Sequence, residues 1–149
     1  MENFLPRERF VSMSEKIKTV EKQDENDLNE LLKIRREKLE YLKQNGKDPF
    51  EITTCNRDIS SKEVIDNFET LEGKDVHLAG RIMSWRDMGK ACFMDIYDKA
   101  GRIQVYLKID DIGEEQYQEL SKWDIGDIIS VEGFVFKTRR GEISIHAKK

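Results

Sequence analysis

The strongest constraint on the fold of this chain is a two-residue alternation that recurs between residues 76 and 108. Three segments alternate apolar residues with polar or aromatic ones. Their apolar positions are Val76, Leu78 and Ile82, then Cys92, Met94 and Ile96, then Ile103, Val105 and Leu107. This alternation predicts three β-strands, each with one buried face and one mixed face. Residues 98–101 (DKAG) separate the second and third segments and predict a hairpin turn.

A helical segment and two more strands are predicted after this block. Residues 113–122 have helical spacing, with Tyr117 and Leu120 as apolar anchors. Residues 128–137 and 142–146 predict a fourth and a fifth strand, joined by the basic turn TRRG. Three strands, a helix and two strands form the element order of an OB-fold, a five-stranded Greek-key barrel. We therefore predict a β-rich α+β fold with a helix between strands three and four.

The N-terminal part is predicted to contain an amphipathic helix over 27–45 and a short helix over 61–69. In the first helix, leucines share one arc at helical spacing: Leu28, Leu31, Leu32, Leu39 and Leu42. The sequence SSKE, residues 60–63, is typical of a capping box. Residues 1–25 show no sustained period, so we expect them to be disordered or an extension added upstream. The expected organisation is an extension (1–25), a helix with a connecting segment (26–75) and the barrel (76–149).

Composition excludes several classes of function. The chain of 149 residues carries a net charge of −4, so nucleic-acid binding would need locally clustered Lys and Arg. Its two cysteines, Cys55 and Cys92, lack metal-ligand spacing, which predicts reduced thiols and no metal site. No run approaches the ~20 apolar residues of a membrane helix, and the N-terminus carries no apolar export segment, so we expect a cytoplasmic protein. No catalytic arrangement is recognisable, which favours a binding module.

Phe93 and Gln104 are predicted to share the mixed face of neighbouring strands. Phe93 alternates with Cys92 and Met94, so it points outward if those two residues fill the barrel. An outward phenyl ring can stack on a nucleobase, or it can pack beneath the N-terminal helix. Gln104 offers an amide that can bond O4 and N3–H of uracil together, although it can equally be an ordinary surface glutamine.

Charged residues flank this face at two turns. The cations are Arg81, Arg86 and Lys90 near the first turn, and Lys137, Arg139 and Arg140 near the last. Glu142 can accept a hydrogen from a base, or it can pair with one of the arginines of the last turn. Arg35 and Arg36, on the first helix, can meet a phosphate backbone, although Arg35 can alternatively be salt-bridged or snorkelling.

Three stretches resemble the N-terminal anticodon-binding domain of bacterial class II lysyl-tRNA synthetases. They are RREKLEYL, GRIMSWRDMGKACFMDIYDKAGRIQVY and KWDIGDIISVEGFVFKTRRGEISIH. The resemblance implies that Phe93 stacks on the central uridine of a UUU-type anticodon and that Gln104 and Arg86 hydrogen-bond that base. It also implies that Glu142 lies near the first anticodon position.

The same resemblance implies a role for the first helix and a larger parent enzyme. Arg35 and Arg36 would lie against the anticodon stem of lysine tRNA. The parent enzyme attaches lysine to this tRNA with ATP and Mg²⁺, as a homodimer with a catalytic domain in the same chain. This chain contains none of the three class II motifs, so we expect it to be non-catalytic and without a cofactor of its own. Trp85 departs from the family, which commonly has a basic residue there.

Two other functions stay open. A free-standing OB-fold could bind single-stranded nucleic acid without sequence preference. A structural module would instead use the mixed face to dock another protein, and it would show no salt-dependent binding to nucleic acid.

Overall fold

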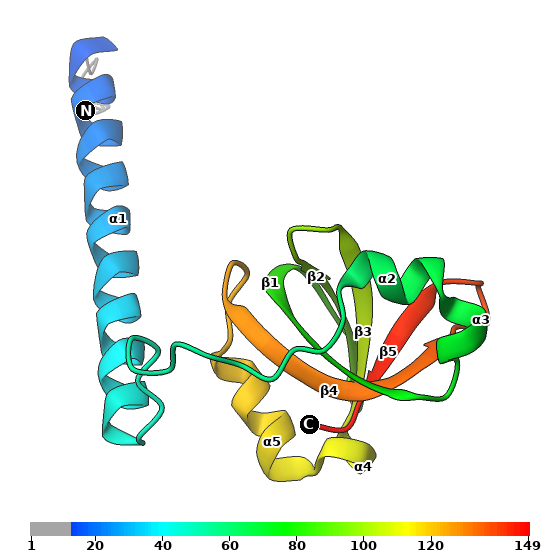
Figure 1. Cartoon of the computed structure of the whole chain (residues 1–149). Coiled ribbons are helices and arrows are strands. Elements are labelled where there is room, and N and C mark those ends of the chain that lie inside the picture. Colours follow the sequence, from blue (N-terminus) through cyan, green and yellow to red (C-terminus); the bar gives the residue numbers. More distant parts are fainter. Residues whose placement is uncertain (1–12) are drawn as a thin grey trace, which may run out of the picture. The chain divides into compact units, whose positions relative to one another are not determined.

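The computed structural model of the chain describes residues 13–149, with side chains from residue 25 onward. This part forms two compact units that divide after Ile52, and each unit is described by itself (Figure 1). The division falls earlier than the predicted boundary between residues 75 and 76, because the connecting segment joins the barrel unit.

The first unit is built on one long helix, α1 (Met13–Gln44). It begins fourteen residues before the predicted start at Asp27. Of the segment expected to be disordered, residues 13–25 are helical, and residues 1–12 lie outside the described residues. The early residues of α1 are rich in Lys and Glu, which are good helix formers and need no apolar arc to extend a helix. The helix stops where predicted, at Gly46, which adopts a left-handed φ of 68°.

The second unit is a closed five-stranded barrel, which confirms the predicted OB-fold. Its strands are β1 (Asp75–Asp87), β2 (Ala91–Tyr97), β3 (Arg102–Lys108), β4 (Ile128–Lys137) and β5 (Ile143–Ala147). The strand order around the barrel is β1-β2-β3-β5-β4, and β3 runs parallel to β5 while the other pairs are antiparallel. The predicted hairpin turn is present, since Asp98 N–H donates to the Gly101 carbonyl at 3.0 Å.

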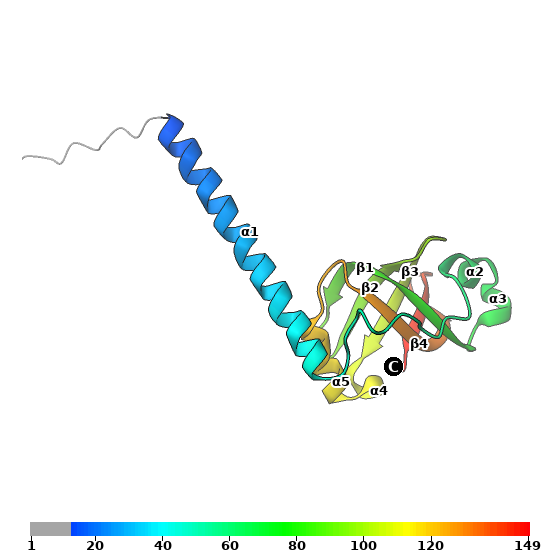
Figure 2. The same ribbon diagram turned by 60° about the vertical axis from the view of Figure 1, so that its left-hand side comes forward.

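Short helices lie at different ends of this barrel (Figures 1 and 2). The predicted helix over 61–69 is two helices, α2 (Ser61–Asp66) and α3 (Phe68–Leu71), which are separated at Asn67. The capping box is confirmed, with Ser60 as the N-cap and Glu63 bonding back to it. The predicted helix over 113–122 is α5 (Glu114–Glu119) followed by a 3₁₀ turn, η1 (Leu120–Lys122), and α4 (Ile109–Ile112) precedes both.

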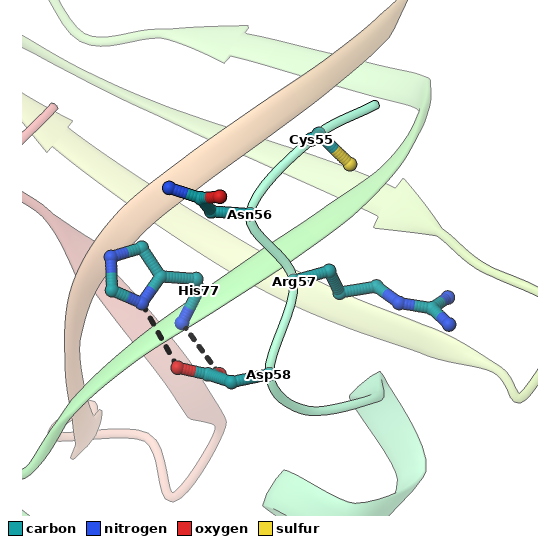
Figure 3. A pocket seen from close by; sticks show the side chains of 5 residues that line it. All are labelled: Cys55, Asn56, Arg57, Asp58 and His77. Carbon is teal, nitrogen blue, oxygen red and sulfur yellow. Dashed lines mark hydrogen bonds and ion pairs between the residues drawn. The ribbon is translucent and has the colours of Figure 1, made fainter. Parts of the chain in front are cut away.

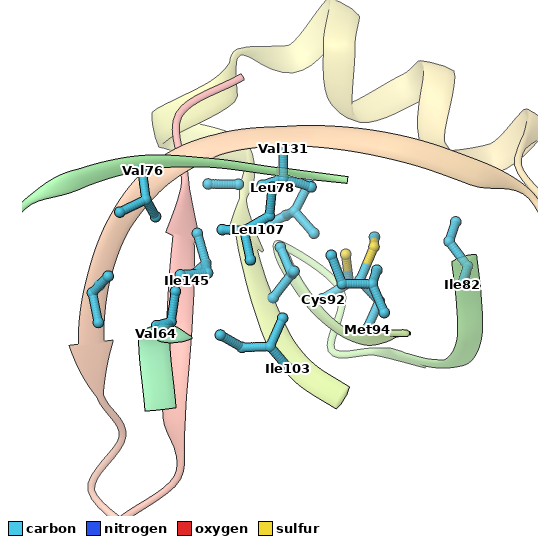
Figure 4. Close-up of a cluster of buried hydrophobic side chains, with 14 of the residues drawn as sticks. Val64, Val76, Leu78, Ile82, Cys92, Met94, Ile103, Leu107, Val131 and Ile145 are labelled. Carbon is cyan, nitrogen blue, oxygen red and sulfur yellow. The ribbon is translucent and has the colours of Figure 1, made fainter. Parts of the chain in front are cut away.

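The barrel interior is filled by the inward residues of all five strands (Figure 4). Every apolar position of the three alternating segments is buried, as predicted. Val64 of α2 is fully buried as well and joins this core from one end of the barrel. Because the inward positions are committed to packing, the outward positions of the same strands are the ones available for binding.

Two carboxylates fasten the connecting segment to the barrel. Asp58 accepts hydrogen bonds from the backbone N–H and the ring Nδ1 of His77, both at 2.9 Å. Asp98 accepts bonds from the backbone N–H and the hydroxyl of Ser61, both at 2.7 Å. Burial opposes ionisation of Asp98, but the bonds from Ser61 outweigh it and lower the pKa of this carboxyl. The segment that precedes β1 is therefore a structural part of the barrel unit.

Candidate nucleic-acid interface

One row of outward residues runs around the barrel, from strand to neighbouring strand. Strand register pairs Arg86 with Phe93, Phe93 with Tyr106, Tyr106 with His146, and His146 with Phe134. Each residue of the row comes from the next strand around the barrel, β1, β2, β3, β5 and β4. We call the four ring-bearing members, Phe93, Tyr106, His146 and Phe134, the aromatic row.

Phe93 lies on the outer face, where its alternation with Cys92 and Met94 predicts it. The Phe93 ring is half-buried, and its centroid lies 4.8 Å from that of the Tyr106 ring. The guanidinium carbon of Arg86 lies 5.8 Å from the Phe93 centroid. Phe93 therefore rests on a neighbouring ring and carries a cation beside it. The structure brings Arg86 and Phe93 together, as the resemblance implies for two residues that contact the same base.

Gln104 is not an ordinary surface glutamine. Only 7% of it is exposed, and its Oε1 accepts a hydrogen bond from the Ser144 hydroxyl at 3.0 Å. It lies on the outer face opposite Asp95, and this pair is two residues along β2 and β3 from the pair of Phe93 and Tyr106. An amide held this way can still donate through Nε2 to a base carbonyl, while Oε1 stays bonded to Ser144.

Arg102 is a residue of this face that sequence reasoning missed. Its Nη1 donates to Asp95 Oδ1 at 2.8 Å, and its Nη2 donates to the Glu142 carboxylate. Glu142 is thus in a cross-strand ion pair, but with Arg102 rather than with Arg139 or Arg140. The signal was available, because Arg102 precedes Gln104 by two residues and so shares its face of β3.

The other predicted cations lie further from Phe93. Arg81 is paired in register with Tyr97, about 13 Å along β2 from Phe93, and its Nη1 donates to the Gly126 carbonyl at 2.6 Å. The Lys137 amine lies 4.5 Å from the Phe68 ring centroid, over α3. Lys90 is exposed in the β1–β2 turn. The structure therefore joins Arg86 to Phe93 but does not gather all the predicted cations around it.

Arg35 and Arg36 are both exposed on α1. Neither forms an ion pair with another residue in the range 25–149. The salt-bridged alternative for Arg35 is therefore absent from the described part of the chain. Both guanidinium groups are available on the surface of the first unit.

Trp85 does not add a stacking surface beside Phe93. Its register partner is the buried Met94, so it faces inward at the end of β1, where its ring lies 6.5 Å from that of Trp123 in an edge-on arrangement. Both tryptophans line a groove of about 730 Å³ together with α5 and η1. A tryptophan suits this inward position because it packs against the core at the barrel end.

A second depression lies where the connecting segment crosses β1 (Figure 3). It has a volume of about 390 Å³ and is lined by Cys55, Asn56, Arg57, Asp58 and His77. The hydrogen bond that the His77 ring donates to the Asp58 carboxylate raises the pKa of His77, and the Glu132 carboxylate, 3.6 Å from Nε2, adds to the effect. None of the residues predicted to bind nucleic acid lines this depression.

Among the described residues, no group of three or more His, Cys, Asp or Glu side chains is placed to hold a metal ion. No helix in the described part of the chain combines the length and the apolar character needed to cross a membrane.

Comparison with known proteins connects this geometry to a family. Residues 76–149 match the family model of the OB-fold nucleic acid binding domain. The chain is 57% identical over 122 residues to the lysine–tRNA ligase of Clostridium botulinum (strain Langeland), covering 82% of this chain and 24% of the relative. The lysine–tRNA ligase of Clostridium acetobutylicum is 51% identical over 126 residues, covering 85% of this chain and 24% of that protein. The chain thus spans about a quarter of the length of these relatives, and the predicted resemblance to lysyl-tRNA synthetases is confirmed.

A solved structure supports the same fold. Asparaginyl-tRNA synthetase from Pyrococcus horikoshii, complexed with asparaginyl-adenylate, superposes with a TM-score of 0.56 at 28% sequence identity. The match covers 64% of this chain and 22% of that chain. Identity to the two lysine–tRNA ligases is about twice as high.

Proposed function

Because residues 76–149 belong to the family of OB-fold nucleic acid binding domains, we propose that this barrel binds the UUU-type anticodon of a lysine tRNA. The observation that carries the proposal is the Arg86–Phe93 pair on the outer face, with Gln104 two residues along β3 from Tyr106, the register partner of Phe93. A stacking ring, a cation and an amide together offer the stacking and hydrogen bonding by which proteins recognise a splayed-out base. The name shared by the relatives, lysine–tRNA ligase, supports lysine tRNA as the ligand.

The residues divide the work by their chemistry. Phe93 stacks on the central uridine, and the Gln104 Nε2 donates to its O4. Arg86 lies beside the Phe93 ring and can reach a base edge or an adjacent phosphate. Glu142 accepts from the first anticodon base, for which it must share or leave its bond to Arg102. Arg35 and Arg36 contact phosphates of the anticodon stem.

The proposal extends to the protein of which such a domain is a part. Anticodon binding selects the tRNA, and the parent enzyme then attaches lysine to it with ATP and Mg²⁺, acting as a cytoplasmic homodimer. No residue of this chain is assigned to that chemistry. The 24% share of the relatives that this chain covers is consistent with a domain devoted to tRNA selection.

The stacking role is tested with a labelled stem-loop that carries the UUU anticodon. Phe93→Ala should weaken binding by about 1–3 kcal/mol, because base–aromatic stacking contributes that much per base. Tyr97→Ala is the matched control, since Tyr97 is an exposed aromatic residue on the same strand that lies outside the row. Unchanged affinity of the Phe93 variant, with its thermal unfolding intact, would refute the assignment. Equal binding of oligo-U, oligo-A and the stem-loop by the wild type would favour a binder without sequence preference.

The reading role of Gln104 is tested by comparing stem-loops with uridine or cytidine at the central position. Gln104→Ala should reduce the preference for uridine, because it removes the donor to O4. Ser144→Ala is the control that breaks the same internal hydrogen bond but keeps the amide. If both variants lose the preference equally, the effect is structural and the assignment is wrong.

A further inference from the structure

We propose that residues 114–123, which comprise α5, η1 and Trp123, form a brace that positions Arg86 for the base. The contact points of this brace on β1 and its turn are Trp85 and Gly89. The inference rests on the proposed function, because it concerns how a side chain assigned to base recognition is held. Trp85 and Tyr117 are positioning residues that act through Arg86 and do not touch the tRNA. The brace also assigns a role to Trp85, for which anticodon binding by itself gives none.

Arg86 has few contacts of its own that could hold it in place. Its guanidinium carbon lies 5.8 Å from the Phe93 centroid, and the group makes no hydrogen bond or ion pair with any residue that the structure describes. A long side chain of this kind has many rotamers to lose when it is ordered. The position of the guanidinium therefore depends on the Phe93 ring and on how firmly the backbone at the end of β1 is held.

The backbone at this end of β1 has a single neighbouring strand. Pairing of β1 with β4 covers residues 75–81. In the part of the chain that the structure describes, residues 84–87 pair with β2 alone. A strand end that is hydrogen-bonded along one edge opens more easily than the middle of a sheet. Support from another element would therefore keep residues 84–87 in place.

The brace supplies this support on both sides of Arg86. The Tyr117 hydroxyl donates to the Gly89 carbonyl at 3.0 Å, which ties α5 to the β1–β2 turn. The Trp85 ring meets the Trp123 ring edge-on, with centroids 6.5 Å apart, which is a favourable arrangement for an aromatic pair. Trp85 directly precedes Arg86 in the chain, and Gly89 follows three residues after it. The two contacts thus hold the backbone before and after this arginine.

The β1–β2 turn closes on itself without the help of Tyr117. Met88 N–H donates to the Ala91 carbonyl, and Gly89 N–H donates to the Asp87 carboxylate, both at 2.8 Å. The bond from Tyr117 therefore does not form the turn but fixes it against the end of the barrel. Because the Tyr117 ring also packs against the core, phenylalanine would keep the packing and remove the hydroxyl alone.

The test measures the affinity of the full chain for the UUU stem-loop in the wild type, Tyr117→Phe, Arg86→Gln and the double variant. Tyr117→Phe should weaken binding about two- to tenfold, the effect expected from loss of one neutral hydrogen bond. In the Arg86→Gln background the same substitution should have no further effect, because the side chain that it positions is gone. A role in stability alone would not produce this coupling. Tyr97→Phe, which removes an exposed hydroxyl on β2, should bind like the wild type.

Trp85→Leu tests the other contact of the brace. It removes the edge-on pair with Trp123, so it should weaken binding in the wild-type background and have no further effect in Arg86→Gln. If Trp85→Leu does not fold, the cycle of Tyr117→Phe with Arg86→Gln decides alone, since that substitution keeps the ring.

The outcomes separate this inference from the function on which it rests. If Arg86→Gln is weakened while Tyr117→Phe binds like the wild type, the brace is refuted and the role of Arg86 in anticodon binding stands. If Tyr117→Phe weakens binding equally with and without Arg86, it does not act through this arginine and the inference fails. If the wild type does not prefer the UUU stem-loop, or Arg86→Gln binds it as tightly as the wild type does, the proposed function fails and the inference falls with it.

Discussion

At the scale of single residues, His77 joins three parts of the barrel unit. Its ring lies on β1 between the Asp58 carboxylate of the connecting segment and Glu132 of β4. The hydrogen bond that the ring donates to Asp58 is the largest cause of the raised pKa of His77. Because the protonated ring is the form that pairs with both carboxylates, this contact depends on pH.

We expect the stabilising contribution of His77 to be lost on the alkaline side. The pKa of the folded state lies above the ordinary value of about 6.5, so the contribution is complete below that value and disappears as the pH rises through the folded pKa. An NMR titration of the His77 ring should give a lower pKa in Asp58→Asn than in the wild type. Glu132→Gln should lower it less, since Glu132 is 3.6 Å from the ring rather than 2.9 Å. An unchanged pKa in Asp58→Asn would contradict the assignment.

The sequence predicts which side chains of the proposed binding face point outward, but it does not predict which side chains they contact. The outward placement of Phe93 follows from local alternation, which depends only on adjacent residues. The bond between Gln104 and Ser144 depends on the parallel pairing of β3 with β5, two strands that lie forty residues apart in sequence. The same pairing places Arg102 next to Glu142. No local sequence pattern contains that register. The burial of Gln104 and the ion pair of Arg102 with Glu142 therefore could not be predicted from the sequence.

At the scale of elements, strand bounds were more predictable than helix bounds. β4 has the predicted limits, 128–137, because turn residues stand at both of its ends. α1 begins earlier than its apolar arc, because a polar, charged sequence can form a helix without a buried face. Periodicity therefore located the amphipathic part of the helix but not its full length.

The close approach of the paired strands β4 and β5 depends on Gly133. A Cβ built on Gly133 would lie 2.1 Å from the His146 carbonyl oxygen and 2.9 Å from the Ala147 Cα, which are backbone atoms of the paired strand. Gly133→Ala should therefore lower the free energy of unfolding by at least about 1–3 kcal/mol, the usual cost of overpacking. Urea unfolding measures this difference. Ser130→Ala, at an exposed position of the same strand, should have little effect. Equal urea midpoints for the two variants would show that β4 and β5 can move apart to admit the extra methyl group without loss of stability.

At the scale of the whole molecule, the proposed binding to tRNA would depend on local rather than overall charge. The net charge of −4 opposes a polyanion, yet Arg86 and Lys148 stand at the two ends of the aromatic row. Arg35 and Arg36 would add a second basic site on α1, in the other compact unit. The two units would then divide recognition, with the barrel reading bases and α1 holding phosphates.

Removing residues 1–52 should separate these two contributions. Residues 53–149 contain the complete barrel core and the connecting segment that is bonded to it, so this part should unfold cooperatively near the temperature of the full chain. It should keep its preference for uridine at the central position. Its affinity should depend less on salt, because the logarithm of the binding constant loses roughly 0.7–0.9 of slope per phosphate contact, or about 1–2 for two arginines. The double variant Arg35→Gln, Arg36→Gln in the full chain should reproduce that smaller slope without any truncation. Identical slopes for the full chain, the double variant and the truncated chain would mean that α1 makes no phosphate contact.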